Sequence, residues 1–188
     1  MTWPFTPLRP HSVDVINADP PWRFVSYTDE ASPKSAGSHY ELMDIDEIKA
    51  LPVGALAARD AWLFLWTSAP QLDDGIDVLR AWGFDYCTRI AWRKVTRNGK
   101  PRPGPGFVVR SWHEDVLIGK VGNPAYSAPL DSLFDGVARQ HSRKPEEFYS
   151  LVERFAPKAR RVDLFSRRRR SGWKHWGREV GKFDREAV

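Results

Sequence analysis

The sequence predicts an α/β fold in which helices flank a central, mainly parallel sheet in three layers. Short β-branched apolar runs alternate along the chain with segments whose apolar residues recur at helical spacing, a pattern typical of α/β proteins. The chain has 188 residues, 41% hydrophobic and 28% charged, so it is long enough to bury a core. We find no internal repeat and no clear boundary, and we expect one domain over residues 1–188.

The first predicted strand carries the most informative position of the chain at its end. Residues 13–18 form a β-branched run that should stop at Asp19, because the two prolines that follow lack the amide donor of a sheet ladder. Residues 26–38 are rich in Ser, Lys, Gly and acidic residues, and we expect a surface loop that could act as a lid. Asp44 and Glu47 then form a capping-box pattern for a short helix.

A buried strand, a helix and a second strand are predicted next. Residues 61–67 form a continuous apolar strand, and residues 70–82 place apolar side chains near helical spacing. Gly83 is well placed to end that helix. Residues 84–92 predict a strand, and residues 94–106, which are basic and rich in Gly and Pro, predict a loop.

The last third predicts strand, loop, helix and strand. Residues 115–121 are an apolar strand pattern, and residues 122–138 are predicted to be a loop. Pro145 suits the first turn of a helix whose apolar residues continue to Phe155. Residues 161–165 predict the final strand.

Charge is segregated along the chain. Residues 1–88 carry 6 basic and 13 acidic side chains, a net −7, whereas residues 89–110 carry 7 basic and no acidic ones, a net +7. Residues 111–138 sum to −3 and residues 139–178, with 13 basic and 4 acidic side chains, to +9, within a total of +5. These basic blocks and the nine tryptophans suggest a nucleic-acid partner. A solvated basic loop is the alternative for the four-arginine run 167–170.

The cysteine content and the hydropathy of the chain indicate the cellular compartment in which it works. The single cysteine, Cys87, excludes an intramolecular disulfide and the usual cysteine-rich zinc sites, and we expect no metal. The longest apolar run, residues 61–66, is too short to cross a bilayer, and the amino terminus lacks a signal pattern. We therefore expect a cytoplasmic protein with no membrane partner.

The tetrapeptide Asp19-Pro20-Pro21-Trp22 predicts chemistry on an aromatic amine. In α/β sheets ligands bind beyond the carboxyl ends of the strands, where this segment should lie. An aromatic amine is a poor nucleophile until its N–H groups are held, and the Asp19 carboxylate and the Pro20 carbonyl supply two acceptors. Trp22 offers a flat face for a flipped base. The alternative is an ordinary Pro-Pro turn, although by average residue usage the tetrapeptide should occur by chance in roughly one such chain in a few thousand.

The tetrapeptide and a set of blocks in the same order resemble the S-adenosylmethionine-dependent adenine-N6 methyltransferases related to the methyl-donor-binding subunit of the eukaryotic messenger-RNA methyltransferase, a family with small bacterial and phage members. The blocks span residues 18 to 179 and include Leu63-Phe64-Leu65-Trp66, Ala81-Trp82-Gly83-Phe84, Trp92-Arg93-Lys94, His113-Glu114, His141-Ser142-Arg143-Lys144-Pro145 and Asp163-Leu164-Phe165. The resemblance implies a Rossmann-like methyltransferase fold and S-adenosyl-L-methionine as the cofactor.

The resemblance also implies roles for individual residues. Asp19 and Pro20 would hold the adenine amino group, with Pro21 and Trp22 framing the base. Arg178 stands where the family usually has asparagine, and this departure bears on the ribose contact of the donor. The donor-binding residues implied are Ala18, Asp19, His141, Ser142, Lys144, Asp163, Phe165, Ser166, Arg167, Gly177, Arg178 and Glu179. The substrate-binding residues implied are Trp22, Tyr40, Trp92, Lys94 and Glu114.

The basic loop adds a separate hypothesis, phosphate contact by Arg93, Arg97, Lys100 and Arg102. For Tyr40 and Trp92 the alternative is core packing. DNA is the favoured substrate and RNA the first rival, since no RNA-binding module is recognisable. The second rival is a catalytically inactive nucleic-acid-binding partner subunit. No G-x-G-x-x-G and no P-loop occur, so nicotinamide enzymes and P-loop NTPases are excluded. A chain of this length has little room for a recognition domain, and we expect loose sequence preference or help from a homodimer.

Overall fold

The computed structural model describes residues 2–23, 42–104, 108–139 and 143–185. Its centre is a seven-stranded sheet with the strand order β5-β3-β4-β2-β1-β6-β7. Only β4 runs antiparallel to its neighbours, so the sheet is mainly parallel and the predicted α/β class is confirmed. The strands are β1 (Val13–Ala18), β2 (Ala57–Thr67), β3 (Asp85–Val95), β4 (His113–Val121), β5 (Leu133–Val137), β6 (Arg161–Leu164) and β7 (Trp173–Trp176).

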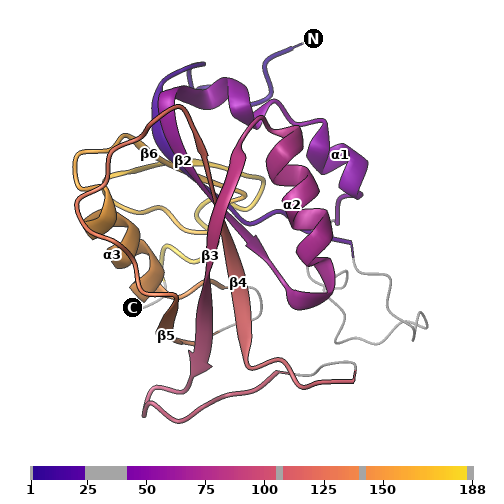
Figure 1. The fold of residues 1–188 in the computed structure, drawn as a ribbon, viewed down its shortest axis with the longest axis vertical. Helices are drawn as coiled ribbons and strands as arrows, with labels where there is room; N and C mark the ends of the chain where they lie inside the picture. Colours follow the sequence, from indigo (N-terminus) through magenta and orange to yellow (C-terminus); the bar gives the residue numbers. More distant parts are fainter. Residues whose placement is uncertain (1, 24–41, 105–107, 140–142, 186–188) are drawn as a thin grey trace.

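Helices cover both faces of this sheet. In Figure 1, α1 (Ile45–Lys49) and α2 (Leu72–Ala81) lie on one side and α3 (Glu146–Phe155) on the other. The core is divided accordingly into two clusters: Ile48, Val78 and Leu79 belong to one, and Phe148 and Val152 belong to the other. A parallel sheet covered on both faces needs apolar side chains on both, which explains why β1 and β2 are nearly continuous apolar runs.

The predicted helices agree closely with the structure. The Glu47 side chain accepts a hydrogen bond from the Asp44 amide at 2.8 Å at the start of α1. Two short 3-10 helices, η2 (Val53–Leu56) and η3 (Ala69–Gln71), precede β2 and α2. Gly83 follows α2 with φ +83°, the left-handed conformation that ends helices.

Two strands were not predicted from the sequence, one of them in a segment predicted to be a loop. β5 falls inside residues 122–138, and β7 follows the last predicted strand. Both are edge strands of four or five residues with few buried side chains, so they lack the apolar run by which the other strands could be recognised. β3 also continues through Val95, into the segment predicted as a basic loop. The predicted lid, residues 26–38, lies outside the described residues.

Candidate active site

Functional side chains gather at the carboxyl edge of the sheet. Asp19 directly follows β1, Asp163 lies in β6, and Lys94 lies near the end of β3. Because β4 is antiparallel, its first residues, including Glu114, reach the same edge. Lys144 comes to this edge from just before α3. The edge therefore combines residues up to 144 positions apart, from Asp19 to Asp163, as the switch-point rule for α/β sheets predicts.

Four of these side chains form an alternating chain of charges. Lys144 Nζ lies 3.0 Å from Asp19 Oδ1 and 2.8 Å from Glu114 Oε2. Lys94 Nζ lies 2.7 Å from Glu114 Oε1. The Lys144 ammonium also sits 4.8 Å from the ring centre of the buried Trp66, a cation–π contact. Lys144 is thus held between two carboxylates, one of which belongs to the tetrapeptide.

Burial and these neighbours set the protonation of the site. Burial raises the pKa of Asp19 to about 6, against the pull of Lys144 and with a contribution from the negative charge of Glu114. Burial also acts to raise the pKa of Glu114, but Lys144 and Lys94 outweigh it and hold that pKa at about 2. Burial opposes the charge of Lys144, yet its two carboxylate partners raise its pKa above the usual value. At neutral pH Asp19 is ionised but can be protonated by modest acidification.

A buried hydrogen-bond network supports the neighbouring carboxylate, Asp163. Asn17 Nδ2 donates to Asp163 Oδ1 at 2.7 Å, and the Tyr149 hydroxyl donates to Oδ2 at 3.2 Å. Asn17 in turn accepts a bond from Trp66 Nε1 at 3.0 Å, which orients its amide. Burial raises the pKa of Asp163 to about 6 even though hydrogen bonds from Asn17, Ser166 and Tyr149 favour the ionised form.

The tetrapeptide itself forms a tight turn. The Trp22 amide donates to the Pro20 carbonyl at 2.9 Å, which leaves that oxygen one further lone pair. The Pro21 carbonyl accepts from the Met43 amide at 2.9 Å. Trp22 is 8% exposed and its Nε1 donates to the Trp66 carbonyl at 3.1 Å. Trp22 is therefore a fixed wall of the site that presents little of its ring to solvent.

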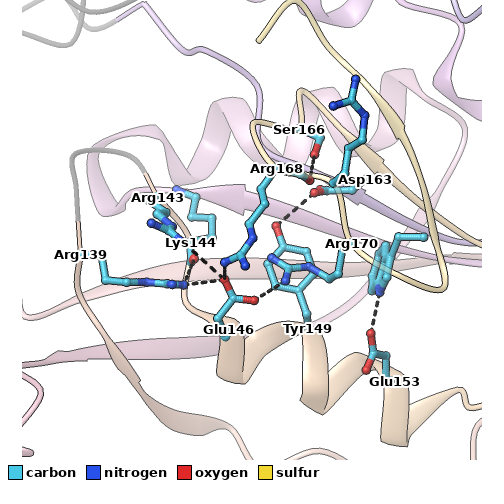
Figure 2. Close-up of polar contacts among 12 residues, drawn as sticks. Arg139, Arg143, Lys144, Glu146, Tyr149, Glu153, Asp163, Ser166, Arg168 and Arg170 are labelled. Atoms are coloured by element: carbon cyan, nitrogen blue, oxygen red, sulfur yellow. Dashed lines mark hydrogen bonds and ion pairs between the residues drawn. The ribbon is translucent and has the colours of Figure 1, made fainter. Parts of the chain in front are cut away.

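An arginine cluster, which the sequence did not predict as a unit, lies beside Lys144 (Figure 2). Arg139 and Arg168 reach Glu146 Oε1 at 2.7 and 3.1 Å, and the Arg170 guanidinium contacts Glu146 Oε2. Arg170 also stacks on Tyr149, 3.5 Å from the ring centre. The basic block 139–178 was the available signal, but nothing in the sequence pattern indicated that Glu146 would be the shared acceptor.

A pocket of about 40 Å³ connects Asp19 and Asp163 with this cluster. Its lining combines the buried carboxylate of Asp163 and the partly exposed carboxylate of Asp19 with lysine and arginine, which suits a ligand that carries a sulfonium, a ribose diol and a carboxylate. The lining includes Asp19, Lys144, Asp163, Phe165, Ser166 and Arg167. Six of the twelve donor-binding residues implied by the resemblance thus lie on one pocket, and the residues present fit S-adenosylmethionine.

The other residues predicted to bind the methyl donor lie near this pocket or outside the residues that the structure describes. Glu179 pairs with Arg167 at 2.8 Å, and the Gly177 backbone packs so closely on residues 165–166 that a Cβ would lie 2.9 Å from the Ser166 amide nitrogen. Arg178 is exposed, and Ala18 is buried at the end of β1. His141 and Ser142 lie outside the described residues.

The predicted substrate residues divide similarly. Lys94 and Glu114 belong to the charge chain described above. Trp92 is 3% exposed and donates to the Gly136 carbonyl at 2.8 Å, so it is largely packed in the core. Arg93 makes a two-pronged ion pair with Asp135, both bonds 2.6 Å, and Arg97 lines a second pocket. Tyr40 lies outside the described residues.

Two further findings concern the described part of the chain. Within it, no cluster of three or more His, Cys, Asp or Glu side chains could hold a metal ion. None of its helices has the length and apolar character needed to cross a membrane.

Comparison with known proteins identifies a family and several relatives that this chain resembles. A family model described as MT-A70 matches residues 13–179. The type II methyltransferase M.MunI of a Mycoplasma species is 30% identical, over 94% of this chain and 81% of that protein. The N(6)-adenosine-methyltransferase MT-A70-like protein of Arabidopsis thaliana is 30% identical over 88% of this chain, and the N(6)-adenosine-methyltransferase catalytic subunit METTL3 of Homo sapiens is 29% identical over 81%. The chain spans about a quarter of the length of these last two relatives.

Proposed function

The chain belongs to the MT-A70 family of adenine-N6 methyltransferases, and on that premise we propose that it transfers a methyl group from S-adenosylmethionine to the N6 amino group of adenine in DNA. The observation that carries the proposal is the position of Asp19. Its carboxylate stands at the end of β1, is ionised at neutral pH and is fixed by Lys144 beside a pocket whose lining fits the donor.

Asp19 and Pro20 prepare the amine in this proposal. Lys144 engages Oδ1 of Asp19, so Oδ2 remains to accept one N–H of the target amine. The second lone pair of the Pro20 carbonyl accepts the other. When its two N–H groups are held by these acceptors, the amine nitrogen moves toward tetrahedral geometry. Its lone pair then leaves conjugation with the ring and points in one fixed direction, toward the methyl group. Proximity and orientation then supply much of the acceleration.

The donor would be held by the residues of the first pocket. Asp163, locked by Asn17 and Tyr149, is placed to accept hydrogen bonds from ribose hydroxyls, and Lys144 and Arg167 are placed for the carboxylate. When bound, S-adenosylmethionine supplies an already activated methyl group, because its sulfonium is a good leaving group. The carboxylates of Asp19 and Asp163 give the surroundings of that cation a complementary charge.

The target adenine would bind at the same edge of the sheet. Trp22 and Pro21 would frame the flipped base, with Tyr40 as a further aromatic neighbour. Lys94 and Glu114 border the position of the amine. The exposed and free Cys87 suits the reducing cytoplasm, where we place the enzyme.

DNA is favoured because the match to the type II methyltransferase M.MunI covers most of both proteins, and because the sequence has no recognisable RNA-binding module. RNA is the second candidate, because N(6)-adenosine-methyltransferases are about 30% identical to the same residues. The test is transfer of labelled methyl from S-adenosylmethionine to DNA and RNA oligonucleotides of matched sequence, each single- and double-stranded. We expect DNA to be the better substrate, with label reduced to background in Asp19→Ala. Faster transfer to RNA would overturn the DNA assignment, and no transfer to any adenine would overturn the activity.

A further inference from the structure

A second pocket, of about 450 Å³, opens beside the active site at the carboxyl ends of β3 and β5. Among the residues that the structure describes, its lining contains four arginines and no carboxylate. The lining residues are Thr96, Arg97, Arg102, Val137, Ala138, Arg139 and Arg143. It shares Arg143 with the first pocket, so the two cavities are neighbours.

Backbone hydrogen bonds fix the walls of this pocket. The Thr96 amide donates to the Lys100 carbonyl at 2.8 Å, which closes a tight turn that carries Arg97. The Arg102 amide donates to the Lys94 carbonyl at 2.8 Å, and its guanidinium donates to the Ala138 carbonyl at 2.7 Å. Arg102 is therefore oriented by a neutral acceptor, and its positive charge is not cancelled by that contact.

The inner wall is positively charged as well. Arg139 and Arg143 share Glu146 with Arg168 and Arg170, so four guanidinium groups converge on one carboxylate. Arg143 is nearly buried, with 5% of its side chain exposed, and Arg139 keeps 11%. Cations of this density at a partly buried site favour an anionic ligand.

The position of the pocket relates it to the reacting base. Arg139 donates to the Lys144 carbonyl at 3.4 Å, and Lys144 touches Asp19 at 3.0 Å. A base whose amine lies against Asp19 must direct its sugar and phosphates away from the sheet edge. The second pocket is therefore linked to the Asp19 contact through Arg139, which lines it, and Lys144.

We propose that the pocket formed by Arg97, Arg102, Arg139 and Arg143 binds a phosphodiester next to the target adenine. This rests on the proposed function, since it requires a nucleic-acid substrate. Guanidinium groups bind phosphate oxygens in pairs, and four of them on one cavity match a phosphate that must be held while its base leaves the stack. The contact reads no base, so it positions the strand for any sequence.

The methyl donor is the competing ligand. The first pocket already offers cations for its carboxylate and the Asp163 carboxylate for its ribose. Of the lining residues within the described part of the chain, Thr96 alone has an acceptor side chain, and its hydroxyl accepts a bond from the Lys100 amide at 3.1 Å. A donor with ribose hydroxyls and an ammonium group is poorly served by four arginines, whereas a phosphodiester requires only cations and donors.

The test is a double-mutant cycle between protein and phosphate. The two proteins compared are the wild type and the double variant Arg97→Gln with Arg102→Gln. Each is titrated with a DNA oligonucleotide that contains a single adenine. The two linkages that flank this adenine are phosphates in one oligonucleotide and neutral methylphosphonates in the other. The matched control is Arg9→Gln with Arg59→Gln, which removes the same charge from exposed positions at the amino ends of β1 and β2. Fluorescence anisotropy across a salt series gives the affinities, and calorimetry gives the affinity for S-adenosylmethionine.

We expect the methylphosphonates to weaken wild-type binding about tenfold or more and the double variant to lose most of that difference. In the double variant, the slope of log affinity against log salt concentration should also become shallower by about one to two units, because fewer phosphates are neutralised. The affinity of the double variant for S-adenosylmethionine, and the DNA affinity of the control variant, should stay near the wild-type values. A methylphosphonate effect that survives in the double variant, equal losses in the control, or a loss of donor affinity instead would overturn the proposal. Expected binding results without methyl transfer to any oligonucleotide would contradict the proposed function and leave the phosphate site standing.

Discussion

At the residue scale the account depends on the charge balance around Asp19. Burial pushes its carboxyl toward the neutral form, and Lys144 pulls it toward the ionised form. The sequence motif predicted the residue and its role, but not Lys144 as its partner at 3.0 Å or Glu114 as the second partner of Lys144. The first pair joins residues 125 positions apart and the second joins residues 30 apart, and such ion pairs leave no local sequence pattern, so only the fold brings them together.

The first prediction concerns the pH dependence of catalysis. The carboxylate accepts the amine only when ionised, so kcat/KM should fall about tenfold per unit as pH drops below about 6. Because the charge of Glu114 contributes to the raised pKa of Asp19, Glu114→Gln should move the inflection to lower pH. A pH–rate profile of both proteins checks this, and an inflection that is absent, or that moves upward in the variant, would contradict it.

The second prediction concerns Asp163. Its pKa of about 6 in the folded protein lies above the ordinary 3.8, so the folded state binds the extra proton and the free energy of unfolding falls as pH rises from about 4 through 6. Above pH 7 Asp163→Asn removes a buried charge and should stabilise the protein by about 1 kcal/mol, or about 3 °C in Tm. Donor affinity should drop about tenfold or more because a charged acceptor is lost.

Thermal melts at pH 7.5 and calorimetry with S-adenosylmethionine measure both effects. Asn17→Ala is the comparison, since it leaves the Asp163 carboxylate without its closest donor and should lower Tm instead. A lower Tm in Asp163→Asn together with unchanged donor affinity would mean that the buried charge serves the fold rather than the ligand.

At the element scale, the docking of α3 against β5 decides where Lys144 lies. The sequence predicted α3 from its apolar spacing but missed β5, because an exposed edge strand carries no apolar run. Gly136 in β5 makes the contact possible: a Cβ there would lie 2.6 Å from both Pro145 Cβ and Trp92 Nε1. Pro145 follows Lys144 directly, so the packing of β5 is transmitted to the ion pair with Asp19.

We therefore predict that Gly136→Ala costs about 1–3 kcal/mol of stability and weakens donor binding by displacing the start of α3. Gly104→Ala is the matched control, because its new Cβ would lie at an ordinary 3.6 Å from the Ser111 carbonyl oxygen. Chemical denaturation and donor titration of the two variants provide the measurement. Equal behaviour of the two would show that β5 does not position Lys144.

At the scale of the whole molecule, the segregation of charge along the chain is the property that the sequence predicts best. The two basic blocks of the chain, residues 89–110 and 139–178, meet at the second pocket, where Arg97 and Arg102 face Arg139 and Arg143. The blocks were visible by counting, but their meeting follows from β5 pairing with β3, a contact that the sequence did not predict. The α/β class and the tetrapeptide at the end of β1 were, by contrast, readable from periodicity and prolines.

This arrangement predicts a steep salt dependence of nucleic-acid binding despite a net charge of only +5. Log affinity for a short DNA duplex should fall linearly with log salt concentration with a slope of about −3 or steeper, since each neutralised phosphate contributes about −0.9. Anisotropy titrations over a series of salt concentrations measure the slope. A slope near zero would contradict binding through the basic blocks.

The central claim is that Asp19 directs methyl transfer to a single atom, N6 of adenine. Its most direct test is nucleoside mass spectrometry of DNA incubated with the enzyme and S-adenosylmethionine carrying a heavy methyl group, for the wild type and for Asp19→Ala. The account predicts heavy N6-methyladenine as the only labelled nucleoside in the wild type and its loss in the variant, whose folding is verified by its melting curve. Label on any other atom, or N6-methyladenine formed equally by a folded Asp19→Ala protein, would contradict it.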